Sequence, residues 1–147
     1  MAKVMRKLNT VSRCQAIYRQ RTSVGSAAEG LSAAMHPFIL SITKNPGRSQ
    51  EQIARDLCLN KSTACRALST LASEGYIMRE ENPLDKREML VYPTERMLSA
   101  AVAVREISKE WGRLLTEDIS DEELAVFEGV LEKIEKKARM LVEDRVE

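Results

Sequence analysis

The sequence predicts a mainly α-helical fold that includes one small β-hairpin. First, apolar residues recur with helical spacing over most of the 147-residue chain. Second, two short apolar segments, residues 76–79 and 88–92, flank a polar stretch that contains proline, which is typical of two paired strands. Third, 44% of the residues are hydrophobic and 31% are charged, so the chain can form a core and is not a disordered or low-complexity sequence.

The N-terminal part of the chain is predicted to contain two helices. Between Val4 and Tyr18 the apolar residues fall near one helical face. The segment GSAAEG at residues 25–30 interrupts this pattern. Residues 37–42 are then predicted to form a short buried helix with Pro37 in its first turn, and the segment NPG at 45–47 ends it.

Two helices joined by a tight turn are predicted between residues 49 and 75. Ser49 and Gln52 have the spacing of a capping box, which opens the first of them. Asn60 is a favourable N-cap for a second helix, from Lys61 to about Ser73, and Gly75 closes that helix. The inward face of the second helix is predicted to carry Ala64, Leu68 and Leu71.

The outward face of this second helix is small, polar and basic. It is predicted to carry Lys61, Ser62, Thr63, Cys65, Arg66 and Ser69. Hydroxyl groups donate to phosphates and base edges, and arginine pairs with guanine through two hydrogen bonds. A helix face that is merely solvated usually mixes acids with its bases, yet no acid occurs here before Glu74. We therefore expect this face, with Gln50 on the preceding helix, to contact double-stranded DNA.

The order of elements between Pro37 and Tyr92 is helix, helix, turn, helix and hairpin, which is that of a winged helix-turn-helix. In this arrangement the second helix of the motif enters the major groove. The tip of the hairpin, called the wing, reaches an adjacent minor groove. Lys86 and Arg87 are the wing residues expected to approach DNA.

Two long helices are predicted after the wing. Thr94 is expected to cap a helix that runs to about Thr116, and a second capping box, Ser120 to Glu123, opens another. The apolar residues of this last helix are alternately three and four apart, as in a coiled coil: Leu124, Phe127, Leu131, Ile134, Ala138 and Leu141. Such a narrow stripe typically packs on another helix, and in a chain this short the partner helix can belong to a second copy.

Charge and composition limit the classes of function. The net charge is +1, but residues 1–43, 44–100 and 101–147 carry net charges of +5, +1 and −5, so the N-terminal part is suited to a polyanion. No segment resembles a membrane span or a signal peptide, which predicts a cytoplasmic protein with no membrane partner. No phosphate-binding loop, nucleophile motif or metal-ligand spacing occurs, so we expect neither an enzyme nor a cofactor or metal site.

The segment SQEQIARDLCLNKSTACRALSTLASEGYIMREENPLDKREMLVYPTE, residues 49–95, resembles the MarR family of bacterial and archaeal regulators. The similarity lies in the NKST start of the recognition helix, the Glu-Gly closure, and a wing of the pattern Asp-x-x-Asp-x-Arg, in which Asn82 replaces the first acid. The resemblance implies one domain over residues 1–147, with a winged-helix lobe at about 36–93 and dimerisation helices at about 1–30 and 94–147.

The resemblance also implies a function. It implies a homodimer that binds a pseudo-palindromic operator, acts as a transcriptional repressor, and is released by a small-molecule effector or an oxidant. By the same resemblance, Asp85 orients the wing and Arg87 enters the minor groove, where a narrow A-tract concentrates negative potential. A winged helix that binds a protein instead of DNA is an alternative, although it would predict an uncharged or acidic recognition helix.

The cysteines and the single histidine leave alternatives open. Peroxide sensors of this family carry a reactive cysteine in the first helix assisted by tyrosine hydroxyls, and Cys14 with Tyr18 four residues later matches that arrangement. The simpler interpretation of Cys14 is a small buried core thiol. Cys58 is expected to be structural, whereas Cys65 is expected to lie beside bound DNA, where oxidation would disturb binding. His36 is expected to be structural, and the alternatives are a ligand-pocket residue, an N-cap residue or a pH-dependent contact.

Overall fold

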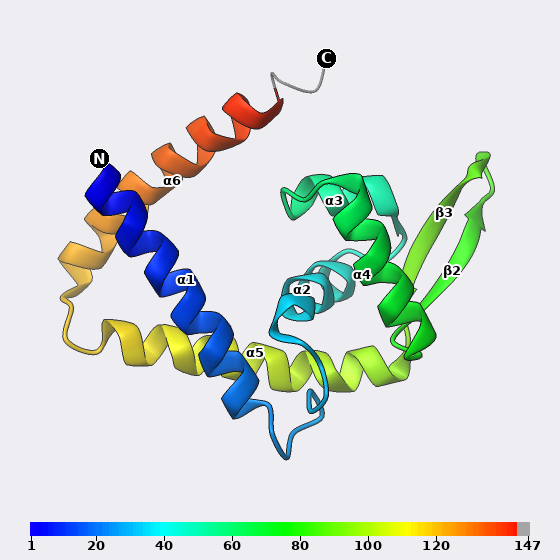
Figure 1. The fold of residues 1–147 in the computed structure, drawn as a ribbon, viewed down its shortest axis with the longest axis horizontal. Coiled ribbons are helices and arrows are strands. Elements are labelled where there is room, and N and C mark those ends of the chain that lie inside the picture. Colours follow the sequence, from blue (N-terminus) through cyan, green and yellow to red (C-terminus); the bar gives the residue numbers. More distant parts are fainter. Residues whose placement is uncertain (144–147) are drawn as a thin grey trace. The chain divides into compact units, whose positions relative to one another are not determined.

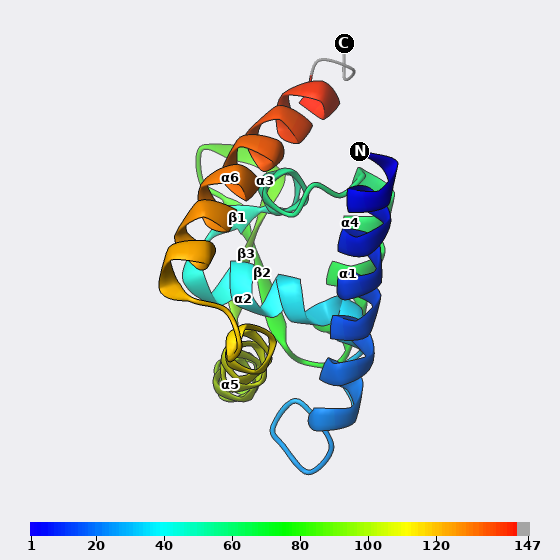
Figure 2. The ribbon, with the colours of Figure 1, turned by 90° about the vertical axis from the view of Figure 1, so that its left-hand side faces the viewer.

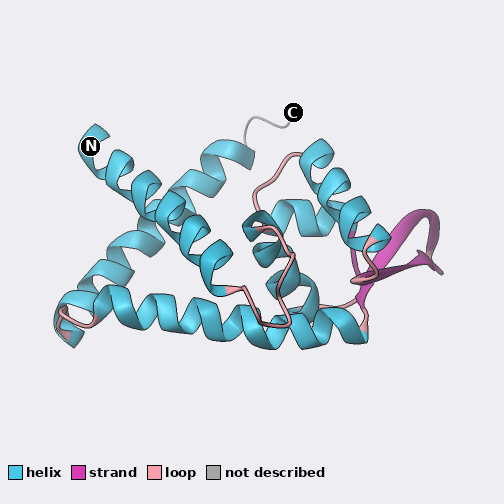
Figure 3. Cartoon of the chain, turned by 60° about the horizontal axis from the view of Figure 1, so that its bottom comes forward, coloured by secondary structure: helices cyan, strands magenta, loops and turns pink. Residues whose placement is uncertain are grey.

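The computed structural model describes residues 1–143, and their fold is mainly helical with one three-stranded antiparallel sheet (Figure 1, Figure 3). The chain divides between Trp111 and Gly112 into two compact units. The elements are α1 (Ala2–Thr22), a short 3-10 helix η1 (Ala33–Met35), α2 (His36–Lys44), β1 (Arg48–Ser49), α3 (Gln50–Asp56), α4 (Lys61–Ser73), β2 (Ile77–Asn82), β3 (Asp85–Pro93), α5 (Glu95–Thr116) and α6 (Asp121–Glu143). The predicted fold class is confirmed.

The helix-turn-helix of α3 and α4 has the bounds that its caps predict. The Ser49 hydroxyl accepts from the Gln52 amide at 3.3 Å, while the Gln52 side chain accepts from the Ser49 amide at 2.9 Å, which completes the capping box. At the start of α4 the Asn60 side chain accepts from the Thr63 amide at 2.8 Å. Gly75, at a φ of +76°, lets the chain turn away after α4.

The sheet is larger than the predicted hairpin. β2 and β3 pair antiparallel, and β1 pairs with the other edge of β3, with Arg48 opposite Val91. The prediction of two strands was therefore incomplete, because β1 is only two residues long and its partner lies far along the chain. Gly47 leads into β1 at a φ of +81°, and its amide donates to the Val91 carbonyl at 2.9 Å.

The core of the first unit is formed by α2, α3, α4, the sheet and the first part of α5, and α2 lies between α3 and α5 (Figure 1, Figure 2). The predicted inward residues of α4 are buried, together with Ala67. From α5, Met97, Ala100, Ala101 and Val104 are fully buried. Burying one leucine- or isoleucine-sized side chain stabilises a fold by about 1.5–3 kcal/mol. The buried side of α4 is therefore held in the core, and this determines which side of the helix is exposed.

The first turn of α5 is bonded to the C-terminal end of α4. The Thr94 hydroxyl donates to the Gly75 carbonyl at 2.7 Å, and the Thr94 amide donates to the Tyr76 carbonyl at 3.0 Å. The Arg96 guanidinium donates to the Glu74 carbonyl and lies 4.4 Å from the centre of the Tyr76 ring. A cation at the carbonyl end of a helix is favourable, so these contacts hold the end of α4 against α5.

α1 extends beyond the predicted segment at both ends and contributes no buried residue to the chain. Near its C-terminal end the rings of Tyr18 and Trp111 are in contact, with their centroids 5.0 Å apart. In the described residues no helix is both long and apolar enough to cross a membrane.

The second unit contains the end of α5 and the helix α6. The predicted capping box opens α6, since Ser120 accepts from the Glu123 amide at 3.2 Å and Glu123 accepts from the Ser120 amide at 3.1 Å. No described residue of α6 is buried, and the side chains of Phe127 and Leu141 are 53% and 55% exposed. The predicted coiled-coil stripe is therefore exposed within the second unit.

Candidate nucleic-acid interface

The outward face of α4 is where the sequence predicts it. Its buried residues lie on one side, and the exposed side carries Lys61, Ser62, Cys65, Arg66 and Ser69. Thr63 is half-buried, and its backbone amide donates to the side chain of the N-cap Asn60. The helix contains no acidic residue. This face offers hydroxyl, guanidinium and ammonium donors along one side of a helix anchored at both ends.

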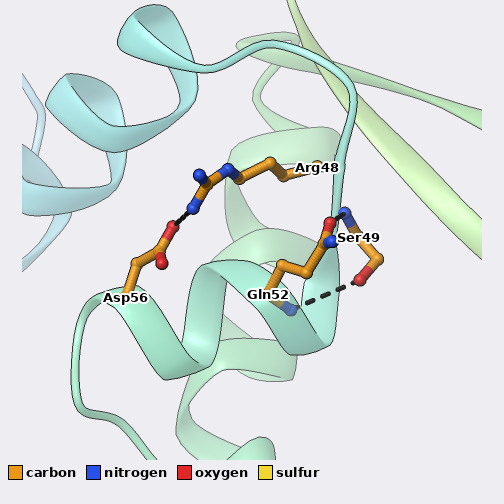
Figure 4. A network of polar contacts seen from close by, with 4 residues as sticks. All are labelled: Arg48, Ser49, Gln52 and Asp56. Carbon is orange, nitrogen blue, oxygen red and sulfur yellow. Dashed lines mark hydrogen bonds and ion pairs between the residues drawn. The ribbon is translucent and has the colours of Figure 1, made fainter.

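The start of α3 is braced by the chain that precedes it. Arg48 in β1 forms an ion pair with Asp56 at the end of α3, and the Ser49–Gln52 capping box lies beside this pair (Figure 4). Gln50, the first residue of α3, is half-buried. These contacts join β1 to both ends of α3, so the strand and the helix-turn-helix form one continuous structure.

The tip of the wing is fixed by bonds from two side chains to the backbone. Asp85 accepts from the Arg87 amide at 3.0 Å, and Asn82 accepts from the Leu84 amide at 3.0 Å. The Asn82 amide group also donates to the Glu88 carboxylate at 2.6 Å. Sequence reasoning missed this role of Asn82, although an Asn-Pro pair is a known signal for such a turn. Lys86 and Arg87 are both exposed on the wing.

A cleft of about 470 Å³ lies between the wing and the starts of α3 and α4. It is lined by Ser49, Gln50, Glu51, Ala54, Lys61, Asp85, Arg87, Glu88 and Met89. The cleft thus brings together four of the predicted site residues, namely Gln50, Lys61, Asp85 and Arg87. The other predicted residues of α4, as well as Lys86 and Cys14, do not line it.

Glu51 is a cleft residue that the sequence analysis did not single out. Its carboxylate lies 2.8 Å from the Lys61 ammonium group, and both side chains are well exposed, at 58% and 80%. The hydrogen bond from Lys61, followed by the charge of Lys61, holds the pKa of Glu51 below its usual value. The two residues belong to different helices, so no helical spacing in the sequence indicates this pair.

The three cysteines, Cys14, Cys58 and Cys65, are all exposed in this chain. The interpretation of Cys14 as a buried core thiol is therefore wrong, because α1 buries none of its residues within the chain. Cys58 is not a core residue either: it occupies the turn between α3 and α4 at a φ of +54°. Cys65 lies on the outward face of α4, as expected. Among the described residues, no group of three or more His, Cys, Asp or Glu side chains could hold a metal ion.

His36 is fully buried, in agreement with a structural position, but its ring nitrogens have no hydrogen-bond partner in the structure. The Nε of Arg19 and the hydroxyl of Ser108 are also buried without a partner. Burial, followed by the charge of Arg19, lowers the pKa of His36. The first unit therefore contains buried polar atoms on α1, α2 and α5 whose hydrogen-bonding capacity is unused.

Comparison with known proteins agrees with this geometry. Residues 37–89 match the sequence model of the MarR family. The chain is 26% identical over 108 residues to the HTH-type transcriptional regulator BilQ of Clostridium symbiosum, covering 74% of this chain and 75% of that protein.

Among solved structures, a MarR transcriptional regulator from Methanosarcina mazei Go1 superposes with a TM-score of 0.86 at 23% identity, covering 96% of this chain and 99% of that one. A MarR family regulator from Listeria monocytogenes, solved with a 26mer DNA, also superposes with a TM-score of 0.86, at 18% identity, covering 94% and 90%. The winged-helix fold is thus shared over nearly the whole chain.

Proposed function

We propose that the chain is a transcriptional regulator of the MarR family, a family of regulators and not of enzymes, and that it binds double-stranded DNA. In this proposal it acts in the cytoplasm as a homodimer on a pseudo-palindromic operator. It represses the genes that it controls until a small molecule or an oxidant releases it.

The observation that carries DNA binding is the composition of the exposed face of α4. Arg66 and Lys61 provide positive charge, Ser62 and Ser69 provide hydroxyl groups, and no carboxylate of α4 opposes an approaching phosphate. A fold with this arrangement places such a helix in the major groove. The related Listeria structure, which was solved with DNA, supports the same use of the fold.

The cleft beside α4 suits the DNA backbone. When a recognition helix occupies the major groove and a wing occupies the neighbouring minor groove, the sugar–phosphate strand between the two grooves passes between helix and wing. We propose that the cleft takes this position in the present chain, because its lining includes Gln50, Lys61 and Arg87 as donors. We therefore assign these three residues to backbone and minor-groove contacts, and Arg66 to a base edge.

The test of DNA binding uses duplexes selected from a random pool by the wild-type chain, together with scrambled versions of them. Arg66→Ala should lower the affinity for the selected duplex and reduce base preference at one position per half-site. An arginine that forms two hydrogen bonds with guanine contributes about 1–3 kcal/mol of discrimination against other bases. Arg87→Ala should lower the affinity for both duplexes and reduce the slope of log affinity against log salt concentration by about 0.9 per wing. If the wild-type chain enriches no duplex, the protein-interaction alternative replaces DNA binding.

Dimerisation is supported by the exposed apolar stripe of α6. An exposed stripe with the spacing of a coiled coil is suited to the same helix of a second copy. The exposed apolar residues of α1, which include Val4 and Val11, offer a second apolar surface to a partner copy. Truncation after Thr116 should give a monomeric or aggregated protein with little operator affinity, as judged by light scattering. A truncated chain that still forms a dimer of full affinity would refute this assignment.

Release by a small molecule is supported by the unused polar atoms of the first unit. Arg19 and His36 carry partnerless buried nitrogens, and Ser108 lies one turn before Trp111, whose ring contacts Tyr18. The charge of Arg19 acts on His36, so the two side chains are neighbours, and a small molecule with hydrogen-bonding groups would satisfy their nitrogens. We expect such compounds to displace the selected duplex from the wild-type chain and not from Arg19→Ala.

Release by an oxidant is supported by the exposure of Cys14 and Cys65. Peroxide should then abolish binding in the wild-type chain and not in Cys14→Ser. Loss of binding that persists in Cys14→Ser and disappears in Cys65→Ser would move the sensor to the recognition helix. A wild-type chain that is insensitive to peroxide leaves the small molecule as the releasing signal.

A further inference from the structure

The carboxylates that line the cleft differ in the partners that hold them. Asp85 accepts from the backbone amide of Arg87, and Glu88 accepts from the side-chain amide of Asn82. Both of these donors are neutral parts of the wing. Glu51 instead pairs with Lys61, a cation that the proposed function assigns to DNA. Among these three acids, Glu51 is thus the one whose partner is also expected to bind phosphate.

The Glu51–Lys61 pair is not required for the fold. An ion pair between two well-exposed side chains contributes little to stability. The start of α3 is already capped by Ser49 and Gln52, and the start of α4 by Asn60, so neither helix depends on the pair. The placement of Glu51 therefore has a more direct consequence for binding than for folding.

A phosphate that enters the cleft competes with Glu51 for the same ammonium group. Lys61 lies 2.8 Å from the carboxylate in the free chain, so it must leave Glu51, or share its charge with it, when it contacts DNA. Glu51 and Lys61 together carry no net charge, whereas Lys61 alone would bring one positive charge to the DNA. Salt dependence of binding follows the number of phosphate charges that the protein neutralises.

Resting on the proposed function, we propose that Glu51 is a positioning residue of the DNA interface that sequesters Lys61 and thereby lowers the affinity of the protein for the DNA backbone. The effect is independent of base sequence, because the competitor is a phosphate. Its consequence is that the free protein binds random DNA less tightly than the basic face of α4 alone would allow.

The test measures affinity against salt concentration for full-length wild type and Glu51→Gln, on the selected duplex and on its scrambled version. Glu51→Gln should bind both duplexes about two- to fivefold more tightly, the range spanned by exposed ion pairs. The salt dependence should become steeper by up to about 0.9 per protomer. Glu106→Gln is the matched control, because Glu106 is an exposed acid on α5 that does not line the cleft.

A second arm shows whether Glu51 acts through Lys61. In Lys61→Gln, the added change Glu51→Gln should bring no further tightening if the carboxylate works by holding the ammonium group. If the tighter binding persists without Lys61, or if Glu106→Gln reproduces it, the proposal is overturned. General repulsion between acidic side chains and DNA would then explain the effect. Unchanged affinity and salt dependence in Glu51→Gln overturns it as well. If the wild-type chain itself binds no duplex, the proposed function and this inference fail together, an outcome distinct from the others.

Discussion

Asn82→Asp restores the acid that the MarR pattern has at this wing position, yet we expect it to loosen the wing of this chain. The Asn82 amide group donates to Glu88 at 2.6 Å, and an aspartate has no proton to donate there at neutral pH. A hydrogen bond to a charged acceptor is worth about 1.5–3 kcal/mol, and two carboxylates about 4 Å apart in water repel by about 1 kcal/mol. Both residues are half-buried, and solvent screening reduces the sum to about 1–2 kcal/mol for opening of the wing.

Hydrogen exchange of the wing amides measures this opening directly. A change of about 1–2 kcal/mol should accelerate exchange by roughly five- to thirtyfold at the wing, while the amides of α4 keep their protection. Asn82→Ala, which removes the donor and adds no charge, should have a smaller effect. Glu88→Gln combined with Asn82→Asp should restore protection, because the new amide can donate to the introduced carboxylate. Equal protection in Asn82→Asp and wild type would refute this account of the wing.

Three further changes test the scaffold. Gly47→Ala should lower the free energy of unfolding by about 1–2 kcal/mol, since the residue has a φ of +81° and an added Cβ would lie 3.1 Å from the Tyr92 hydroxyl. Urea unfolding measures this change, and an unchanged urea midpoint would contradict it. The pKa of His36 in the folded chain lies below 6.5, so the unfolded chain binds a proton more readily as the pH falls, and stability should decline between about pH 7.5 and 5. His36→Phe should flatten that decline, and an equal slope in both proteins would argue against this account. Arg96→Ala should cost about 1 kcal/mol and raise exchange at the end of α4, and undisturbed exchange there would show that the Glu74 contact is not needed.

The features that the sequence predicts well are those set by bonds between near neighbours. Ser49, Asn60 and Ser120 each bond a backbone amide three residues away, so their side chains alone indicate where α3, α4 and α6 begin. The outward residues of α4 follow for the same reason, from helical spacing around its buried face. Asn60 and Ser120 therefore gave reliable boundaries without any knowledge of the tertiary structure.

The features that were missed depend on residues that are distant in the sequence. β1 exists because Arg48 meets Val91, and two residues carry no strand pattern of their own. The Glu51–Lys61 pair forms because the turn between α3 and α4 brings two helix starts together. The exposure of Cys14 was mispredicted for a related reason: helical spacing indicates that α1 has an apolar face, but not whether that face is buried.

The division of α4 into a buried and an exposed face has a consequence for how regulators with this fold diverge. Ala64, Leu68 and Leu71 hold the helix in place, and its end is bonded to α5 through Glu74. Exposed residues such as Arg66 take no part in that packing, and surface substitutions usually change stability by less than about 0.5 kcal/mol. With the exposed face of α4 as the proposed DNA-reading surface, a duplicated copy of this chain would acquire a new set of target genes by a few exchanges on one helix face, while the rest of the protein is inherited unchanged.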